Sequence, residues 1–393
     1  MSTALSRQAQ PEPVNEAEFQ ALKDEIRAYV ENEGEQWLAR FEAEKDANDF
    51  AVQRALWEEL KGRGYLKLAA PVALGGRGLP FARYLELLEI FSRSHGSLRM
   101  IVHVSNGIWR ATWPYANDEQ EERFVKAQVA SETRVAFTLT EPNAGTGADI
   151  RCAVTREGDT YYLSGEKHLI TFGHVAEYLL LFARLEGTRG TDGTVALLVP
   201  SHGEGITNNQ MAHTMGLHGT DHSHLIFERA PVPVANRLGE EGEGLKVALG
   251  GFLVPSRISV GMTCVGLAQR ALDLAVEYAQ QRETFGAKIA TRQAIAFRLA
   301  EMATDVEAAR QLVFHAANTW EQGGDASGES AMAKLFASEM LQRVTDNAIH
   351  VHGGLGYFQS SPVERVYRDA RAQRFEEGTA EVQKQTIARA LLR

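Results

Sequence analysis

The spacing of apolar residues changes twice along this chain, and no other feature of the sequence limits the fold as strongly. Before about residue 134, apolar residues recur every three or four positions, as Phe19, Leu22 and Ile26 do, which places them on one face of a helix. Short β-type runs follow, separated by Gly, Asp and Asn. From about Glu241 the strand signals vanish and long amphipathic segments take their place. This order predicts an α+β protein in three parts.

A chain of 393 residues is too long for one comfortable core, so several domains are expected. Asn15 is placed to cap the first helix, with Glu18 as its reciprocal partner. We predict a flexible N-terminus (residues 1–14), an N-terminal α-helical domain (15–133), a middle β-domain (134–240) and a C-terminal α-helical bundle (241–393). Within them, helices are expected at 52–60, 82–94, 119–129, 258–281, 293–322 and 330–352, and strands at 160–163, 178–182, 194–199 and 225–227.

Composition excludes several classes of function. The formal net charge of −10 argues against nucleic-acid binding, because contact with phosphates needs a basic surface. No run of about 20 uninterrupted apolar residues is present, so no membrane span is expected. The N-terminus lacks the apolar core of a signal peptide. Cys152 and Cys264 lie far apart without metal-ligand spacing, which predicts reduced, partly buried thiols rather than a disulfide. Together these features predict an acidic cytoplasmic enzyme.

Two adjacent carboxylates near the C-terminus are the first candidate catalytic residues. Glu376 and Glu377 directly precede Gly378 and Thr379. This order sets a proton acceptor beside a backbone that can approach a ligand closely, and beside a hydroxyl that can bind phosphate. The tripeptide Glu-Gly-Thr is too short to identify a site alone, so its meaning depends on the segments before it.

Four further segments precede this loop. Residues 136–146 read AFTLTEPNAGT, residues 167–171 read KHLIT, residues 282–286 read RETFG and residues 350–357 read HVHGGLGY. Taken together with Glu377, these ordered segments resemble the acyl-CoA dehydrogenase family, and the match extends from about residue 15 to the end. The resemblance implies an N-terminal helical domain, a middle β-barrel or sandwich domain and a C-terminal four-helix bundle.

The resemblance also implies a reaction. Glu377 would remove the α-proton of an acyl-CoA thioester while a hydride passes from the β-carbon to flavin N5, which gives a trans-2-enoyl-CoA. The implied cofactor is FAD, the implied electron acceptor is an electron-transfer flavoprotein, and the implied assembly is a homotetramer built as a dimer of dimers. The implied setting is fatty-acid or amino-acid catabolism.

Residues at the family's motif positions take the implied binding roles. Arg282 and Thr284 would reach the FAD of a neighbouring subunit, where an arginine fork suits the pyrophosphate. No metal site is implied. The implied cofactor-binding residues are Phe137, Leu139, Thr140, Thr146, Leu169, Thr171, Arg282, Thr284, Phe285, Gln293, His350, Gly353, Gly354, Thr379 and Glu381. The implied substrate-binding residues are Thr146, Ser97, Arg99, Val254, Arg257 and Gly378.

The base must also be strong enough for a weakly acidic α-proton. Burial beneath the flavin and acyl chain would raise the pKa of the carboxyl and bring it closer to the working pH. The family resemblance assigns the Glu377 amide and a flavin ribityl hydroxyl as donors to the thioester carbonyl, where they would stabilise the enolate. Some relatives carry the base near residues 253–257, but no carboxylate occurs there, which favours Glu377.

Two departures from the family pattern leave the substrate open. Glu376 replaces an aromatic or apolar residue, and we expect it to be solvated or salt-bridged because adjacent side chains usually point apart. Ser97 and Arg99 partly match a pattern of glutaryl-CoA dehydrogenase-like members, in which the arginine meets a distal carboxylate. Arg99 would then either bind a substrate carboxylate or pair with a carboxylate elsewhere. His103 stands where that subgroup has a serine, which favours the second reading and plain aliphatic acyl groups.

Other readings stay open. Four crowded histidines could bind a metal, but exposed loop histidines are the expected reading. The alternatives to a dehydrogenase are a flavin-dependent monooxygenase on the same fold, a glutaryl-type oxidative decarboxylase and a non-catalytic acyl-CoA-binding or partner-binding protein. Glu377 argues against the monooxygenase, whose members generally lack this glutamate. The four histidines are His213, His218, His222 and His224.

Overall fold

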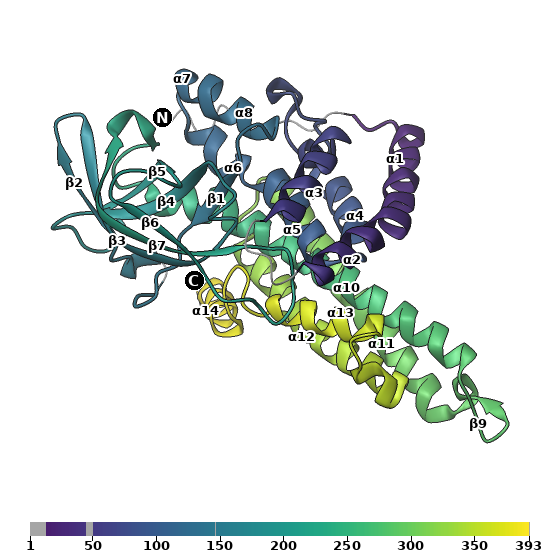
Figure 1. Cartoon of the computed structure of the whole chain (residues 1–393). Helices are drawn as coiled ribbons and strands as arrows, with labels where there is room; N and C mark the ends of the chain where they lie inside the picture. Colours follow the sequence, from purple (N-terminus) through teal and green to yellow (C-terminus); the bar gives the residue numbers. More distant parts are fainter. Residues whose placement is uncertain (1–12, 45–49, 146, 393) are drawn as a thin grey trace.

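The protein is described here by a computed structural model that covers residues 13–44, 50–145 and 147–392. Figure 1 shows the sheet on one side, the N-terminal helices beside it, and a bundle of long C-terminal helices that extends away from both. The predicted α+β class and the predicted order of helices, sheet and helices are confirmed.

The N-terminal part is helical because its apolar residues follow the helical period. Asn15 caps the first helix: its Oδ1 accepts hydrogen bonds from the amides of Ala17 at 3.0 Å and Glu18 at 3.3 Å. Glu18 is the partner of the cap through its side chain: Glu18 Oε1 accepts a hydrogen bond from Asn15 Nδ2 at 3.4 Å. The helices are α1 (Glu16–Tyr29), α2 (Glu35–Ala43), α3 (Ala51–Gly62), α4 (Phe81–Ser92), α5 (Gly96–Gly107), α6 (Trp109–Thr112), α7 (Asp118–Gln120) and α8 (Lys126–Val129).

The middle part is one sheet, eight-stranded within the described residues. Its order is β6-β7-β3-β2-β4-β5-β8, with β1 parallel to β4. The four strands expected from the sequence fall within β3, β4, β5 and β7, and β3 and β7 run to twelve residues each. The sequence pattern missed β6, whose residues Ile-Thr-Asn-Asn-Gln are mostly polar. The strands are β1 (Val135–Thr138), β2 (Ala153–Glu157), β3 (Thr160–Thr171), β4 (Tyr178–Leu185), β5 (Thr194–Pro200), β6 (Ile206–Gln210), β7 (His222–Pro233) and β8 (Arg237–Leu238).

The C-terminal part is a helical bundle. A two-residue hairpin, β9 (Glu283–Thr284) with β10 (Ala287–Lys288), closes its far tip in Figure 1, so strands do not vanish entirely after residue 241. Gly286 allows the tight turn with a φ of +73°. The bundle helices are α9 (Gly244–Lys246), α10 (Val254–Gln281), α11 (Gln293–Glu321), α12 (Ser327–His352), α13 (Pro362–Ala372) and α14 (Ala380–Leu391).

One helical stretch of the described chain, Gly244–Gln281, is long and apolar enough to cross a membrane by length and composition alone. Inside the protein, however, 83% of its apolar window is buried. The stretch ends in α10, which packs against α4, α11 and α12. Its apolar surface is therefore accounted for by the protein core.

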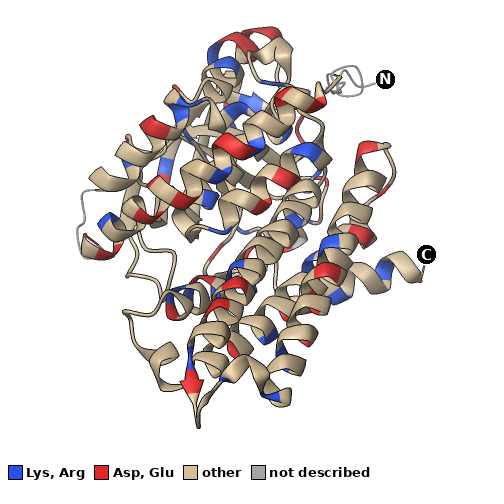
Figure 2. Ribbon diagram, turned by 90° about the vertical axis from the view of Figure 1, so that its right-hand side faces the viewer, with Lys and Arg blue, Asp and Glu red and all other residues tan. Residues whose placement is uncertain are grey.

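The N-terminal helices and the C-terminal bundle share one hydrophobic core. Leu88 of α4 and Val265 of α10, both fully buried, belong to the same cluster, while the sheet forms a second cluster with α6, α8 and the segment before α10. Cys152 and Cys264 are free thiols, as predicted, but both are fully rather than partly buried. In Figure 2, acidic and basic residues are mixed along the helices. The shared core sets α5 against α10, and the candidate site lies where these two helices meet.

Candidate active site

The carboxylate of Glu377 lies at the meeting point of α5, α10 and the loop before α14. The Ser256 hydroxyl, near the start of α10, donates to Glu377 Oε1 at 2.8 Å. His103 of α5 places its Nε2 3.0 Å from the same hydroxyl oxygen. Ser256 and His103 are both buried. Neither was assigned a role on the base from the sequence, although Ser256 directly precedes the predicted Arg257.

Burial makes Glu377 a stronger base. It raises the pKa of the carboxyl to about 7, although the Ser256 hydrogen bond opposes the rise; Glu376 adds to it, while Arg257 and Lys334 oppose it. Burial, together with the charge of Arg99, lowers the pKa of His103 to about 3, so this imidazole is neutral near neutral pH. We assign its proton to Nε2, because Ser256 then accepts from His103 and donates to Glu377.

The loop that carries Glu377 is held through its backbone. Glu377 has a φ of +53° and Gly378 a φ of +102°, a left-handed region that a residue with a side chain rarely occupies. Arg257 Nε donates to Glu377 O at 3.2 Å, and Gln383 Nε2 donates to it at 2.9 Å. Lys334, fully buried, donates to Gly378 O at 2.7 Å. These donors keep Glu377 in its uncommon backbone conformation.

Glu376 forms a two-pronged ion pair with Arg99, whereas Glu377 bonds Ser256. Arg99 Nη2 lies 2.6 Å from Glu376 Oε1, and Arg99 Nη1 lies 3.0 Å from Glu376 Oε2. The Arg99 side chain is 0% exposed and that of Glu376 18%. Burial raises the pKa of Glu376, but the charge and hydrogen bonds of Arg99 outweigh it, so that pKa is lowered overall. Of the two states expected for Glu376, the structure contains the salt-bridged one.

The first group of predicted cofactor residues lies together beside the sheet. The His168 amide donates to Thr140 O at 3.0 Å, which joins the segment after β1 to β3. A buried ion pair fixes this junction: Lys167 Nζ lies 2.8 Å from Glu141 Oε1 and donates to Leu139 O at 2.9 Å. Phe137, on β1, stacks against Phe252 with 4.4 Å between ring centroids. Leu169 interrupts the pairing of β3 with β7, with a φ of +56° and 54% of its surface exposed, and Thr171 follows at the end of β3.

The second group lies at the far tip of the bundle. Phe285, in the β9–β10 turn, is 98% exposed, and Figure 1 places this hairpin far from the sheet. The rings of Tyr278 and His352 stack with centroids 4.5 Å apart, which brings the end of α12 beside the end of α10. Within a single subunit, the two groups of predicted cofactor residues therefore lie far apart. The second group comprises Arg282, Thr284, Phe285, Gln293, His350, Gly353 and Gly354.

The donor chemistry of the two groups fits a flavin nucleotide. The first group offers hydroxyls and exposed apolar surface to a ring system. The second offers a guanidinium, exposed aromatic surface and two glycines; a Cβ built on Gly353 or Gly354 would meet no atom within 4 Å. Thr379 and Glu381 are exposed at the start of α14, and Thr146 lies outside the described residues.

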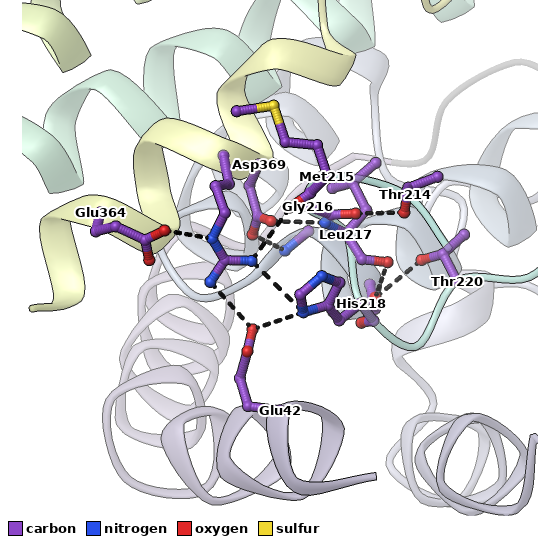
Figure 3. Close-up of polar contacts among 12 residues, drawn as sticks. Glu42, Thr214, Met215, Gly216, Leu217, His218, Thr220, Glu364 and Asp369 are labelled. Atoms are coloured by element: carbon purple, nitrogen blue, oxygen red, sulfur yellow. Dashed lines mark hydrogen bonds and ion pairs between the residues drawn. The ribbon is translucent and has the colours of Figure 1, made fainter. Parts of the chain in front are cut away.

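Ser97 contacts the loop between β6 and β7. Its hydroxyl lies 2.8 Å from Thr220 Oγ1 and 3.3 Å from Leu217 O. Figure 3 shows how this loop is also bound by α13 and α2: the Leu217 amide donates to Asp369 Oδ1 at 2.7 Å, and His218 Nδ1 lies 3.0 Å from Glu42 Oε1. Ser97 thus joins α5 to the loop between β6 and β7. Val254 is half-buried at the start of α10.

The crowded histidines do not form a metal site. Among the described residues no group of three His, Cys, Asp or Glu side chains could hold a metal ion. Of the four, only His213 is an exposed loop residue. His218 is half-buried against Glu42, while His222 and His224 lie on β7 and are half-buried. The expectation of exposed loop histidines was wrong for His222 and His224, because β7 begins earlier than the apolar run at 225–227 indicates. His218 is a loop residue as expected, but its contact with Glu42 leaves it half-buried.

Comparison with known proteins agrees with this architecture. Family models of acyl-CoA dehydrogenases match the chain in sequence order: the N-terminal domain at 16–132, the middle domain at 136–230 and the C-terminal domain at 242–392. The chain is 36% identical over 340 residues to an acyl-CoA dehydrogenase of Bacillus subtilis, covering 86% of this chain and 89% of that protein.

Two further relatives extend the comparison. The chain is 36% identical over 334 residues to the caffeyl-CoA reductase-Etf complex subunit CarC of Acetobacterium woodii, covering 84% of this chain and 87% of that protein. The structure of butyryl-CoA dehydrogenase from Megasphaera elsdenii superimposes with a TM-score of 0.88 at 31% identity, covering 98% of this chain and 100% of that one. This chain therefore belongs to the acyl-CoA dehydrogenase family of flavin-dependent oxidoreductases.

Proposed function

We propose that the protein is an FAD-dependent acyl-CoA dehydrogenase that converts an acyl-CoA to its trans-2-enoyl-CoA, with Glu377 as the base that removes the α-proton. The observation that carries the proposal is the half-buried Glu377 carboxylate, which accepts a hydrogen bond from Ser256 and whose pKa is raised to about 7. A carboxyl with that pKa is largely ionised just above neutral pH and still strong enough to abstract a proton. The same carboxylate supports a dehydrogenase over a monooxygenase.

The chain's own residues orient and activate the base. Ser256 fixes one carboxylate oxygen, so the other is free to face the α-carbon. Arg257 and Lys334 hold the loop by its carbonyls, which leaves the Glu377 amide to bond the thioester oxygen. An N–H aimed at that oxygen stabilises the enolate charge as it develops. FAD, when bound, would accept the hydride from the β-carbon. Arg257 and Val254 stand at the start of α10 for contact with the substrate.

We infer that the FAD site is shared between subunits of a homotetramer. Thr140, Leu169 and Thr171 would contact the flavin of their own chain, and the group at the bundle tip would contact that of a neighbour. The separation of these groups supports the inference. Electron-transfer flavoprotein is the proposed acceptor, supported by the relative CarC, which is named as a subunit of a complex with Etf. The proposed location is the cytoplasm.

Anaerobic titration of the purified protein with a panel of acyl-CoAs tests the function. We expect one FAD per subunit and bleaching of the flavin by at least one saturated acyl-CoA. Glu377→Gln should keep FAD and bind the thioester but lose flavin reduction, because an amide cannot accept the proton. Full reduction by that variant would move the base elsewhere, with Glu376 the first candidate. FMN in place of FAD would contradict the proposal.

A further inference from the structure

Building on the proposed function, we propose that Glu376 is the permanent partner of Arg99 and that this pair restricts the enzyme to acyl groups whose distal end is uncharged. A carboxylate of the protein would then occupy the position that a distal carboxylate of the substrate would need. Removing the charge of Glu376 should open the site to such a substrate.

The pair belongs to the same cluster as the base. Arg99 and His103 stand four residues apart on α5, the spacing that puts two side chains on one face of a helix. His103 contacts Ser256, and Ser256 contacts Glu377. Glu376 closes the ring, because it precedes Glu377 in the chain and bonds Arg99. The Arg99 guanidinium is thus linked through Glu376 to Glu377, the residue whose carboxylate is proposed to remove the α-proton.

The two terminal nitrogens of Arg99 are engaged by Glu376. Both terminal nitrogens of Arg99 bond Glu376, one to each oxygen, and Gln373 Nε2 also donates to Glu376 Oε1 at 3.2 Å. Among the described residues, Arg99 Nε is the buried nitrogen of this side chain without a partner. Because the two terminal nitrogens already span both oxygens of Glu376, a substrate carboxylate would have to displace Glu376 to use that fork.

The charges around Arg99 also disfavour a distal carboxylate on the substrate. A distal carboxylate would enter a buried cluster that already holds Glu376 and an ionised Glu377, while the cations around them are engaged. Arg99 faces Glu376, Lys334 bonds loop carbonyls, and Arg257 bonds the Glu377 carbonyl. A buried carboxylate without a cation of its own is strongly disfavoured, so the site rejects it. Neutral alkyl groups meet no such penalty.

The test measures acyl-CoA binding separately from turnover. Butyryl-CoA and glutaryl-CoA are titrated by calorimetry into the FAD-loaded Glu377→Gln protein, with and without Glu376→Gln. We expect Glu376→Gln to tighten glutaryl-CoA by about tenfold or more and to change butyryl-CoA by less than about threefold, since the amide keeps the shape of the side chain but frees the guanidinium charge. Adding Arg99→Met should abolish the gain.

Glu364→Gln is the matched control. Glu364 Oε1 accepts from Arg368 Nε at 2.7 Å, so this variant removes one carboxylate charge from an Arg–Glu pair in another cluster. It should leave the ratio of the two affinities unchanged. In the protein with Glu377 intact, flavin reduction by the same two thioesters should show the same preference for butyryl-CoA.

Three results would overturn the inference. One is preference of the unmodified protein for glutaryl-CoA, lost in Arg99→Met. Another is a folded, FAD-loaded Glu376→Gln protein whose affinity for glutaryl-CoA does not rise. The third applies if Glu376→Gln does not fold. The double variant Arg99→Met/Glu376→Met, which lacks both charges, should then still bind glutaryl-CoA poorly, and tight binding of glutaryl-CoA by it would contradict the inference. Absence of flavin reduction by any acyl-CoA would instead contradict the proposed function.

Discussion

The Ser256 hydroxyl donates to Oε1 of Glu377 across 2.8 Å and so ties the candidate base to the start of α10. Behind it, His103 holds the serine oxygen at 3.0 Å. The Glu377 carboxylate is therefore oriented by a chain of two hydrogen bonds that begins on another helix, α5. A carboxylate fixed in this way cannot rotate freely, which keeps its second oxygen available for the substrate.

Removal of the serine hydroxyl should weaken the base's orientation and raise its pKa further, because the hydrogen bond lowers that pKa. In Ser256→Ala we expect flavin reduction at pH 7 to fall by about tenfold and the pH profile to shift upward. Ser256→Thr, which keeps a hydroxyl, should restore the profile. Stopped-flow reduction across a pH series measures both effects, and an unshifted profile in Ser256→Ala would argue against an orienting bond.

The pH dependence of the unmodified enzyme should report Glu377. Since its pKa lies at about 7, the ionised base becomes more abundant as the pH rises through 7. The rate of flavin reduction by limiting acyl-CoA should therefore rise from pH 6 and level off above about pH 8. His103, with a pKa of about 3, stays neutral in that range and should add no inflection. A rate that falls between pH 6 and 8 contradicts the assignment.

The same raised pKa predicts that ionisation of Glu377 lowers the stability of the folded protein. A carboxyl with a raised pKa favours the folded state below its unfolded pKa, and this contribution is lost as the pH rises through about 7. Glu377→Gln cannot ionise, so it should be more stable than the unmodified protein above pH 7, by about 1–3 kcal/mol. The difference should shrink toward pH 5. Denaturant melts at both pH values, with Glu364→Gln as the control, check this.

Lys334 should matter for stability and for the base together. Its ammonium donates to Gly378 O and, at 3.2 Å, to Arg374 O, so Lys334→Met leaves two loop carbonyls without this donor. We expect a loss of about 1–3 kcal/mol in the free energy of unfolding and a higher apparent pKa of Glu377, because the lysine charge lowers it.

Lys246→Met is the control for that experiment. Lys246 is exposed and pairs with Glu243 at 3.0 Å, so its loss should change stability by less than about 1 kcal/mol. If Lys334→Met unfolds at the same denaturant concentration as the unmodified protein, the bonds from Lys334 do not hold the loop.

Arg282→Ala should weaken FAD retention and assembly together, because Arg282 stands at the bundle tip, away from its own chain's Thr140 and Thr171. Light scattering and flavin absorbance after gel filtration measure both. Arg229→Ala removes an exposed arginine of β7 that pairs with Glu157 and should change neither. A stable monomer of the unmodified protein that holds FAD tightly would contradict a shared site.

The sequence determined the order of helices, sheet and bundle and the identity of the candidate base. Both the order of the elements and the candidate base can be predicted from residues that are close together in the sequence. The period of apolar residues fixes the type of an element, and Glu377 stands in a short motif whose order with four other segments is legible along the chain. The longest elements, α10, α11 and α12, begin and end within a few residues of the expected positions because their periods are long and strong. Short polar strands such as β6 carried too little pattern to be recognised.

Only the tertiary structure decided what surrounds the base. His103, Ser256 and Glu377 are separated by more than a hundred residues at each step, and nothing in their local sequence says that they touch. The sequence left Arg99 open between a substrate carboxylate and a carboxylate of the protein; the packing of α5 against α10 and the loop joins it to Glu376, 277 residues away. The burial that raises the pKa of Glu377 is likewise a property of the packed helices, because desolvation depends on every side chain that excludes water from the site.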